Sequence, residues 1–192
     1  MVNNIRIFTA ISIPDSITGQ IVSHLPSWQE RLSFQKWVDP RDLHITLHFI
    51  GDASPSSLEA VQNAMQEAVS RSRRFSIELS KLGSFGREDR PSVLWLGLNS
   101  LPEELLQLHQ RLGETLHSGI GYTPETRPYR PHVTLARKYI ADKPCSVEYL
   151  HNLSDSYQQQ KTAFDVNRIT LYRTRLGESP MYEPLVVLNF DK

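Results

Sequence analysis

The chain contains one short motif twice, and this repetition limits the folds that it can adopt more than any other feature. His44-Ile-Thr-Leu and His132-Val-Thr-Leu lie 88 residues apart. The same offset relates Pro14 to Pro102, and each proline follows an apolar segment and precedes polar residues, as at the start of a helix. The repeat therefore predicts a unit of strand, helix, loop and second strand that carries the His-x-Thr motif.

Hydrophobic periodicity predicts further elements between and after the two copies. Apolar residues at helical spacing predict a helix over 54–71, and alternation predicts a strand over 74–80. Glycines at 83–86 predict a turn, followed by a charged loop to Pro91. Two late segments, 163–172 and 182–190, are expected to be strands. The pattern over 142–152 is ambiguous and allows a short helix after Pro144.

The expected fold class is α+β and bilobal. Two pseudo-symmetric lobes would place antiparallel sheets along a central cleft, with the helices outside. No low-complexity linker divides the chain, so residues 1–192 are expected to form one domain, with repeat units at about 5–50 and 93–138.

Composition excludes several classes of protein. Twenty-one basic residues balance twenty-one acidic ones, which argues against a protein that coats long nucleic acid through bulk charge. Basic residues are nevertheless in excess over 71–90 and 123–138. No apolar run is long enough for a membrane span, the first residues lack a signal pattern, and Cys145 is the single cysteine. We therefore expect a cytoplasmic protein without disulfides.

The two motifs are expected to present the same polar pair to one groove. In a strand, residues i and i+2 share a face, so His44 and Thr46 point one way while Ile45 points into the core. His132 and Thr134 repeat the arrangement. Two related lobes would then bring two imidazoles and two hydroxyls together.

This set of groups suits in-line displacement at phosphorus. One histidine of a pair can act as a base while the other acts as an acid near neutral pH, and threonine hydroxyls can donate to phosphate oxygens. A single histidine on a strand is usually structural. A shared fold explains repeated apolar positions, but it does not require a repeated polar pair.

Metal binding is the competing chemistry, because His44 and His48 are four residues apart. On a strand their Cα atoms lie roughly 13 Å apart, too far for both to bind one ion at about 2.1 Å. Ala136 replaces His48 in the second copy, and Asp42 is the only carboxylate close to either motif. We expect no metal and no other cofactor. The remaining histidines are interpreted as ordinary surface or half-buried residues: His24, His109, His117 and His151.

Four segments together resemble the 2H phosphoesterase superfamily. They span 5–14, 37–51, 93–97 and 130–137, and the resemblance extends from residue 5 to about 190. Within the superfamily, they are most similar to the RNA 2′,3′-cyclic phosphodiesterases of the LigT/ThpR type, once called 2′-5′ RNA ligases. The resemblance implies a bilobal fold, motifs that line a central cleft, no metal, and hydrolysis of a terminal 2′,3′-cyclic phosphate to a 2′-phosphate.

The resemblance also implies a role for each motif residue. His44 matches the proton donor and His132 the proton acceptor. Thr46 and Thr134 match the phosphate-binding hydroxyls. Arg137 matches an arginine that follows the second motif, and the first copy has no arginine at that place.

Aromatic residues near the motifs are candidates for substrate stacking. Phe8, Trp37 and Tyr129 could stack on a base or a ribose, although Phe8, inside an apolar strand, equally fits a core position. The basic stretches 71–90 and 123–138 would flank an RNA end. The expected partners are RNA 3′ ends or small cyclic-phosphate nucleotides, with no membrane and no obligate protein partner.

Two other functions remain open. The same site could join RNA ends through a 2′-5′ linkage, with a ribose hydroxyl in place of water. The chain could also be a non-catalytic module that binds RNA ends or nucleotides, although binding alone does not need a matched acid and base. Abundant water favours hydrolysis over joining, because no lid is evident in the sequence.

Overall fold

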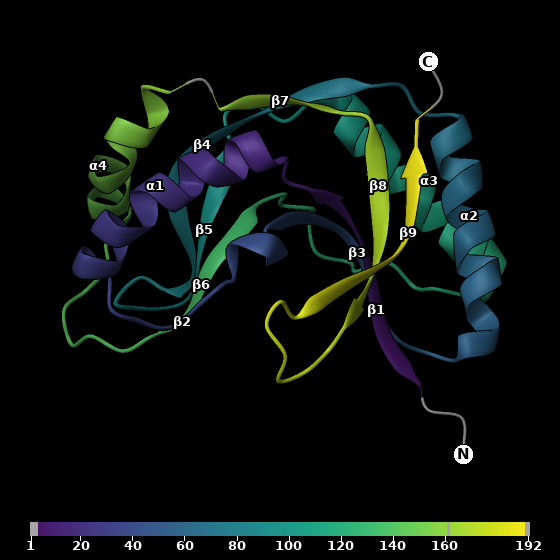
Figure 1. The fold of residues 1–192 in the computed structure, drawn as a ribbon, viewed down its shortest axis with the longest axis horizontal. Coiled ribbons are helices and arrows are strands. Elements are labelled where there is room, and N and C mark those ends of the chain that lie inside the picture. The colour runs from purple at the N-terminus through teal and green to yellow at the C-terminus, as the bar shows by residue number, and fades with distance from the viewer. Residues whose placement is uncertain (1–3, 161, 191–192) are drawn as a thin grey trace.

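The computed structural model describes residues 4–160 and 162–190. Within these ranges the chain forms four α-helices, two short 3-10 helices and nine strands (Figure 1). In chain order, the elements are β1 (Ile5–Ser12), α1 (Asp15–Arg31), β2 (Phe34–Trp37), η1 (Pro40–Asp42), β3 (His44–Ala53), η2 (Pro55–Ser57), α2 (Leu58–Ser70), β4 (Phe75–Arg87), β5 (Arg90–Leu98), α3 (Glu103–Ile120), β6 (Val133–Tyr139), α4 (Val147–Gln158), β7 (Ala163–Val166), β8 (Arg168–Thr174) and β9 (Tyr182–Asn189).

The strands form one sheet in the order β7-β4-β5-β6-β3-β1-β8-β9, with β2 attached to β6. Every pairing along this order is antiparallel. The sheet has two halves that meet at β3 and β6, the strands with the repeated motif. A single ladder pair, Ile45 with Val133, joins the halves within the described residues. The sequence therefore predicted the α+β class and the two antiparallel halves correctly.

The helix of each repeat covers the half of the sheet that contains the strands of the other repeat (Figure 1). Although α1 follows β1 in the chain, it packs against α4 over the half that contains β4, β5 and β6. In this contact Trp28 Nε1 donates to the carbonyl of Leu153 at 3.2 Å. Correspondingly, α3 follows β5 but packs against α2 and contacts β3. Because each repeat supplies the helix that covers the other repeat's strands, we infer that the two halves fold as one domain.

The helices begin where the prolines predicted. Helix α1 starts directly after Pro14 and α3 directly after Pro102, and both carry acidic side chains in their first turn, where the helix dipole favours negative charge. The expected helix over 54–71 is confirmed as η2 followed by α2, and the stretch after Pro144 forms α4. No helix in the described ranges is long and apolar enough to span a membrane.

Two expectations about strands were wrong. The predicted turn at 83–86 is instead part of β4, and the predicted charged loop is reduced to a turn at 88–89 between β4 and β5, which pair as a long hairpin. Gly83 allows a close approach within the strand, because a Cβ there would overlap the ring of Trp95 on the neighbouring strand. The expected single strand over 163–172 is divided, since β7 pairs with β4 whereas β8 pairs with β1 and β9.

Candidate active site

Each motif histidine is oriented by the backbone carbonyl two residues before it. His44 Nδ1 donates to the carbonyl of Asp42 at 2.6 Å, and His132 Nδ1 donates to the carbonyl of Arg130 at 2.7 Å. A carbonyl oxygen only accepts, so Nδ1 carries the proton in both neutral rings and Nε2 keeps its lone pair. His44 Nε2 accepts from the hydroxyl of Thr46 at 3.1 Å. Both rings thus have the same tautomer, which leaves Nε2 available as a base or, once protonated, as an acid.

A β-bulge follows the motif in both strands. The pairing of β3 with β1 skips Leu47, and the pairing of β6 with β5 skips Leu135. An extra residue shifts the alternation of side chains by one position. As a result, Phe49 and Arg137 are exposed at equivalent places beside their motifs, whereas His48 is buried. The expected alternation of side chains between the two faces of each strand holds as far as Thr46 and Thr134, and the bulge then interrupts it.

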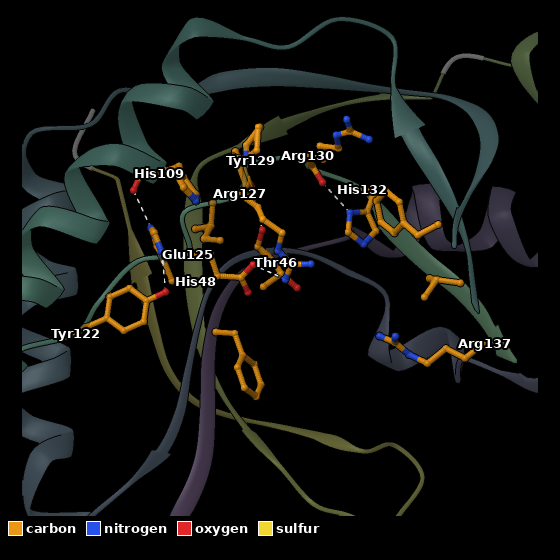
Figure 2. Close-up of a pocket in the computed structure, with 15 residues that line it drawn as sticks. Thr46, His48, His109, Tyr122, Glu125, Arg127, Tyr129, Arg130, His132 and Arg137 are labelled. Atoms are coloured by element: carbon orange, nitrogen blue, oxygen red, sulfur yellow. Dashed lines mark hydrogen bonds and ion pairs between the residues drawn. The ribbon is translucent and has the colours of Figure 1, made fainter. Parts of the chain in front are cut away.

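Two neighbouring cavities lie over the motifs. One, the motif cavity, has a volume of about 600 Å³ and is lined by both histidines and both threonines. The other, the side cavity, has a volume of about 690 Å³ and extends from His132 to Tyr122 (Figure 2). Four residues line both cavities: Thr46, Phe49, His132 and Arg137. The structure therefore brings the five predicted motif residues together in one cavity.

Burial lowers the pKa of both motif histidines. Desolvation lowers the pKa of His44 to about 4, while the hydrogen bond to Asp42 opposes this shift. The pKa of His132 is lowered by the same cause, against the hydrogen bond to Arg130. The positive charge of Arg137 lowers the pKa of both rings further. Both imidazoles are therefore neutral at pH 7 in the free protein, and a bound phosphate anion would raise both pKa values.

The three aromatic candidates lie in different surroundings. Phe8 is 3% exposed, and its ring packs against that of His44 with centroids 4.9 Å apart. Tyr129 lines the side cavity and stacks on His109 with centroids 3.8 Å apart. Trp37 is half-buried and lines the motif cavity. The ring of Trp37 meets that of Phe34 edge-on with centroids 6.1 Å apart, the longest of these three ring contacts.

Sequence reasoning missed the structural role of Asp42. Its buried carboxylate accepts hydrogen bonds from the backbone N–H groups of Met181, at 2.7 Å, and Tyr182, at 3.0 Å. The ring of Tyr182 in turn packs edge-on against His44 with centroids 5.1 Å apart. Asp42 therefore attaches the start of β9 to the first motif. Its position beside the motif was visible in the sequence, but its partners about 140 residues away were not.

His109 is half-buried, as expected, but its ring contacts were not foreseen. His109 lies between His48 and Tyr129 in a stack of three rings from α3, β3 and the segment before β6 (Figure 2). The pKa of His109 is lowered to about 4, and that of His48 is also lowered, chiefly by burial. No sequence signal pointed to this stack, because its members come from separate elements.

The described residues contain no group of three or more His, Cys, Asp or Glu side chains that could hold a metal ion. The bulge after Thr46 separates His48 from the face that carries His44. His48 instead donates from Nε2 to the carbonyl of His109 at 2.8 Å. Metal-independent chemistry remains a prediction that the chelation experiment below tests.

Comparison with known proteins identifies the family. A family model described as the 2′-5′ RNA ligase superfamily matches residues 13–178, a range that includes both motifs. The chain belongs to this superfamily. A Bacillus subtilis (strain 168) relative named RNA 2′,3′-cyclic phosphodiesterase is 32% identical over 183 residues, which cover 93% of this chain and 92% of that protein. The resemblance inferred from the four sequence segments is thereby confirmed.

A second relative of the chain is a longer protein of about twice the matched length. It comes from Geobacillus stearothermophilus, is also named RNA 2′,3′-cyclic phosphodiesterase, and is 35% identical over 154 residues, or 80% of this chain. The chain spans only 47% of the length of that relative.

Solved structures show the same fold. The crystal structure of E. coli LigT complexed with 3′-AMP has a TM-score of 0.77 at 24% identity and covers 98% of this chain and 99% of that one. The crystal structure of TT0787 of Thermus thermophilus has a TM-score of 0.74 at 21% identity, with 96% and 97% covered. These likenesses confirm the expected α+β architecture of the superfamily member.

Proposed function

We propose that the chain hydrolyses a 2′,3′-cyclic phosphate at an RNA 3′ end to a 2′-phosphate, without a metal. The observation that carries this proposal is the matched pair of imidazoles. His44 and His132 line one cavity, and each is held by a carbonyl so that Nε2 is the reactive nitrogen. The names of the relatives from Bacillus subtilis and Geobacillus stearothermophilus support the same reaction.

In the proposed mechanism the two histidines act on opposite sides of the phosphorus. His132 Nε2 removes a proton from water as the water oxygen bonds to phosphorus. His44 Nε2 gives a proton to the 3′-oxygen as the bond between phosphorus and that oxygen breaks. In-line geometry prevents one imidazole from serving both oxygens, so each lobe supplies one group.

The remaining polar groups of the motif cavity would bind the phosphate. The hydroxyls of Thr46 and Thr134 donate to its non-bridging oxygens, and Arg137 supplies positive charge. Among the described residues, no carboxylate forms an ion pair with Arg137. The bound anion raises the pKa of His44, which must be protonated to act as the acid. Thr46 then turns its hydroxyl from His44 to the phosphate.

The proposed substrates are RNA 3′ ends or small cyclic-phosphate nucleotides, with Trp37 as the stacking residue for a base or ribose. A reducing compartment such as the cytoplasm suits a chain whose one cysteine, Cys145, is free and buried.

An end-group experiment tests the proposal. Purified protein is incubated with EDTA and an oligonucleotide that ends in a 2′,3′-cyclic phosphate, and the product end is identified by its mobility and by ³¹P NMR. We expect a 2′-phosphate at the same rate with and without the chelator. Complete loss of turnover, restored by one specific metal, would contradict the metal-independent mechanism. A 3′-phosphate product would contradict the proposed leaving group.

The side cavity favours one second candidate, the joining of RNA ends. It lies beside His132, the proposed base, and it is lined by Arg130, which suits a phosphate-bearing strand, whereas Arg127 there is paired with Glu125 at 2.8 Å. A ribose hydroxyl in this cavity could replace water as the nucleophile. The same incubation with an added 5′-hydroxyl oligonucleotide distinguishes the two reactions, because joining gives a longer product with a 2′-5′ linkage. Binding of both oligonucleotides without any turnover would instead indicate a non-catalytic module.

A further inference from the structure

The two motif strands meet at a single ladder position within the described residues. Ile45 of β3 pairs with Val133 of β6, and both side chains are fully buried. Away from this pair, β3 continues along β1, while β6 continues along β5 and β2. One ladder pair fixes a point of contact between two strands but constrains the angle between them only weakly. Other contacts therefore help to determine how far apart the two motifs lie.

A second link joins the motifs through residues 129 and 130. The hydroxyl of Tyr129 donates to the carbonyl oxygen of Thr46 at 3.0 Å. The next residue, Arg130, accepts the Nδ1 proton of His132 through its own carbonyl at 2.7 Å. The backbone of the first motif and the imidazole of the second are thus connected through two consecutive residues.

The hydroxyl of Tyr129 is held in place by a stack of rings (Figure 2). Tyr129 stacks on His109 with centroids 3.8 Å apart, and His109 stacks on His48 with centroids 4.2 Å apart. The nitrogens of His48 are bonded to the His109 carbonyl at 2.8 Å and to the Tyr122 hydroxyl at 3.3 Å. Burial raises the pKa of Tyr129 well above its usual range, so its phenol remains a donor. The position of the hydroxyl is therefore determined by α3, β3 and the segment before β6 together.

Within the part of the chain that the structure describes, the first copy shows no equivalent link. Arg41 stands 88 positions before Tyr129, and its exposed guanidinium pairs with Asp39 at 2.7 Å. We propose that Tyr129 is a positioning residue that sets the angle between the two motif strands, and through it the spacing of His44 and His132 around the phosphate. This inference rests on the proposed function, and it replaces the expectation that Tyr129 stacks on the substrate.

Two matched substitutions test the inference by kinetics. Tyr129→Phe removes one hydroxyl and keeps the ring stack. Tyr122→Phe is the control, because it removes the hydroxyl at the other end of the same stack, which bonds to His48 instead of Thr46. We expect Tyr129→Phe to lower kcat roughly ten- to a hundredfold, since a displacement of about 1 Å between reacting groups can cost 10²-fold. KM should stay within about twofold, and Tyr122→Phe should lower kcat at least about fivefold less than Tyr129→Phe does.

Three kinetic results would overturn the inference. Wild-type kcat in Tyr129→Phe would show that the hydroxyl does not position the motifs. Equal losses of kcat in both variants would assign the effect to the integrity of the stack as a whole. A higher KM with unchanged kcat in Tyr129→Phe would mean that the hydroxyl contacts substrate.

A second measurement separates this inference from the proposed function. In ¹H NMR spectra of the free protein, Tyr129→Phe should shift the imidazole Hε1 signals of both His44 and His132. Tyr122→Phe should shift that of His48 and leave those two unchanged. If the wild-type chain turns over no cyclic phosphate, the proposed function fails while the spectra still decide the inference. Unmoved His44 and His132 signals in Tyr129→Phe would overturn it.

Discussion

The two motif segments share a pattern of burial and a bulge but differ in the side chains around them. Over 44–49 and 132–137 the sequence of half-buried, buried and exposed positions is identical, and both strands bulge at the leucine of the His-x-Thr-Leu motif. The exposed position after the bulge holds Phe49 in the first copy and Arg137 in the second. In the first copy the carbonyl that orients the histidine belongs to Asp42, which is buried and whose carboxylate accepts two hydrogen bonds. In the second copy it belongs to Arg130, which is exposed.

This difference separates what the chemistry needs twice from what it needs once. The proposed mechanism requires a carbonyl partner and a free Nε2 at both histidines, and any residue type supplies a backbone carbonyl. It requires positive charge for one phosphate only once, so that charge can belong to one lobe. The first lobe is then free to use the corresponding positions for packing, as Asp42 does with the start of β9.

The largest expected effect comes from the histidines themselves. His44→Ala and His132→Ala should each lower kcat by about 10²–10⁴-fold, the usual contribution of general acid–base catalysis. A cyclic phosphate in which sulfur replaces the 3′-oxygen makes the comparison sharper, because a thiolate leaves without a proton. Turnover of this substrate should be largely restored in His44→Ala and should stay impaired in His132→Ala.

Recovery of His132→Ala instead would reverse the two roles. Recovery of neither variant would argue against the acid–base scheme. The pH dependence of kcat and of kcat/KM for the wild-type chain provides an independent check. Since phosphate raises the pKa values of the histidines, the alkaline limb of kcat should lie at higher pH than that of kcat/KM.

The next contrast to test is between Phe49 in the first copy and Arg137 at the equivalent position of the second copy. Arg137→Ala should lower kcat and raise KM, with a combined loss in kcat/KM of roughly ten- to a hundredfold, because hydrogen bonds to charged groups contribute about 1.5–3 kcal/mol. Phe49→Ala removes an exposed apolar ring and should raise KM alone by less than that. Steady-state kinetics of the two variants side by side measure the contrast. Equal effects on kcat would mean that the charge of the second lobe is not specific to the reaction.

The smallest effect concerns stability in acid. The unfolded chain binds a proton at each histidine below about pH 6.5, whereas the folded pKa of His44 is about 4. Protonation in this window therefore favours the unfolded chain, so stability present above pH 6.5 is lost as the pH falls towards 4. We expect the thermal midpoint to drop by several degrees over this window, at about 2–4 °C per kcal/mol for a chain of this size.

Asparagine substitutions of the two motif histidines show which lobe accounts for the loss of stability in acid. His44→Asn should flatten the pH dependence of the thermal midpoint more than His132→Asn. Three aromatic rings, those of Phe8, Tyr172 and Tyr182, lie against His44, whereas two lie against His132. Greater flattening by His132→Asn would contradict the stronger desolvation of His44.

Local pattern in the sequence predicted the repeated unit and its polar face. Prolines at 14 and 102 marked the starts of α1 and α3, and i, i+2 spacing placed each threonine beside its histidine. These predictions succeeded because helix starts and strand faces depend on residues a few positions apart. The turn predicted at 83–86 was wrong, because Gly83 is required by Trp95 on the next strand and not by a turn.

By itself, the sequence determined that the His-x-Thr motif occurs twice, and it supplied the residues that we propose for the chemistry. Only the tertiary structure decided where Phe49 and Arg137 point, because a bulge arises from pairing with another strand. It also decided that helices are exchanged between repeats and that Tyr129 reaches Thr46. Such contacts join residues tens of positions apart, so they cannot be predicted from local periodicity in the sequence. The geometry of this site depends on those long-range contacts, because its two halves come from strands that pair at a single ladder position in the described residues.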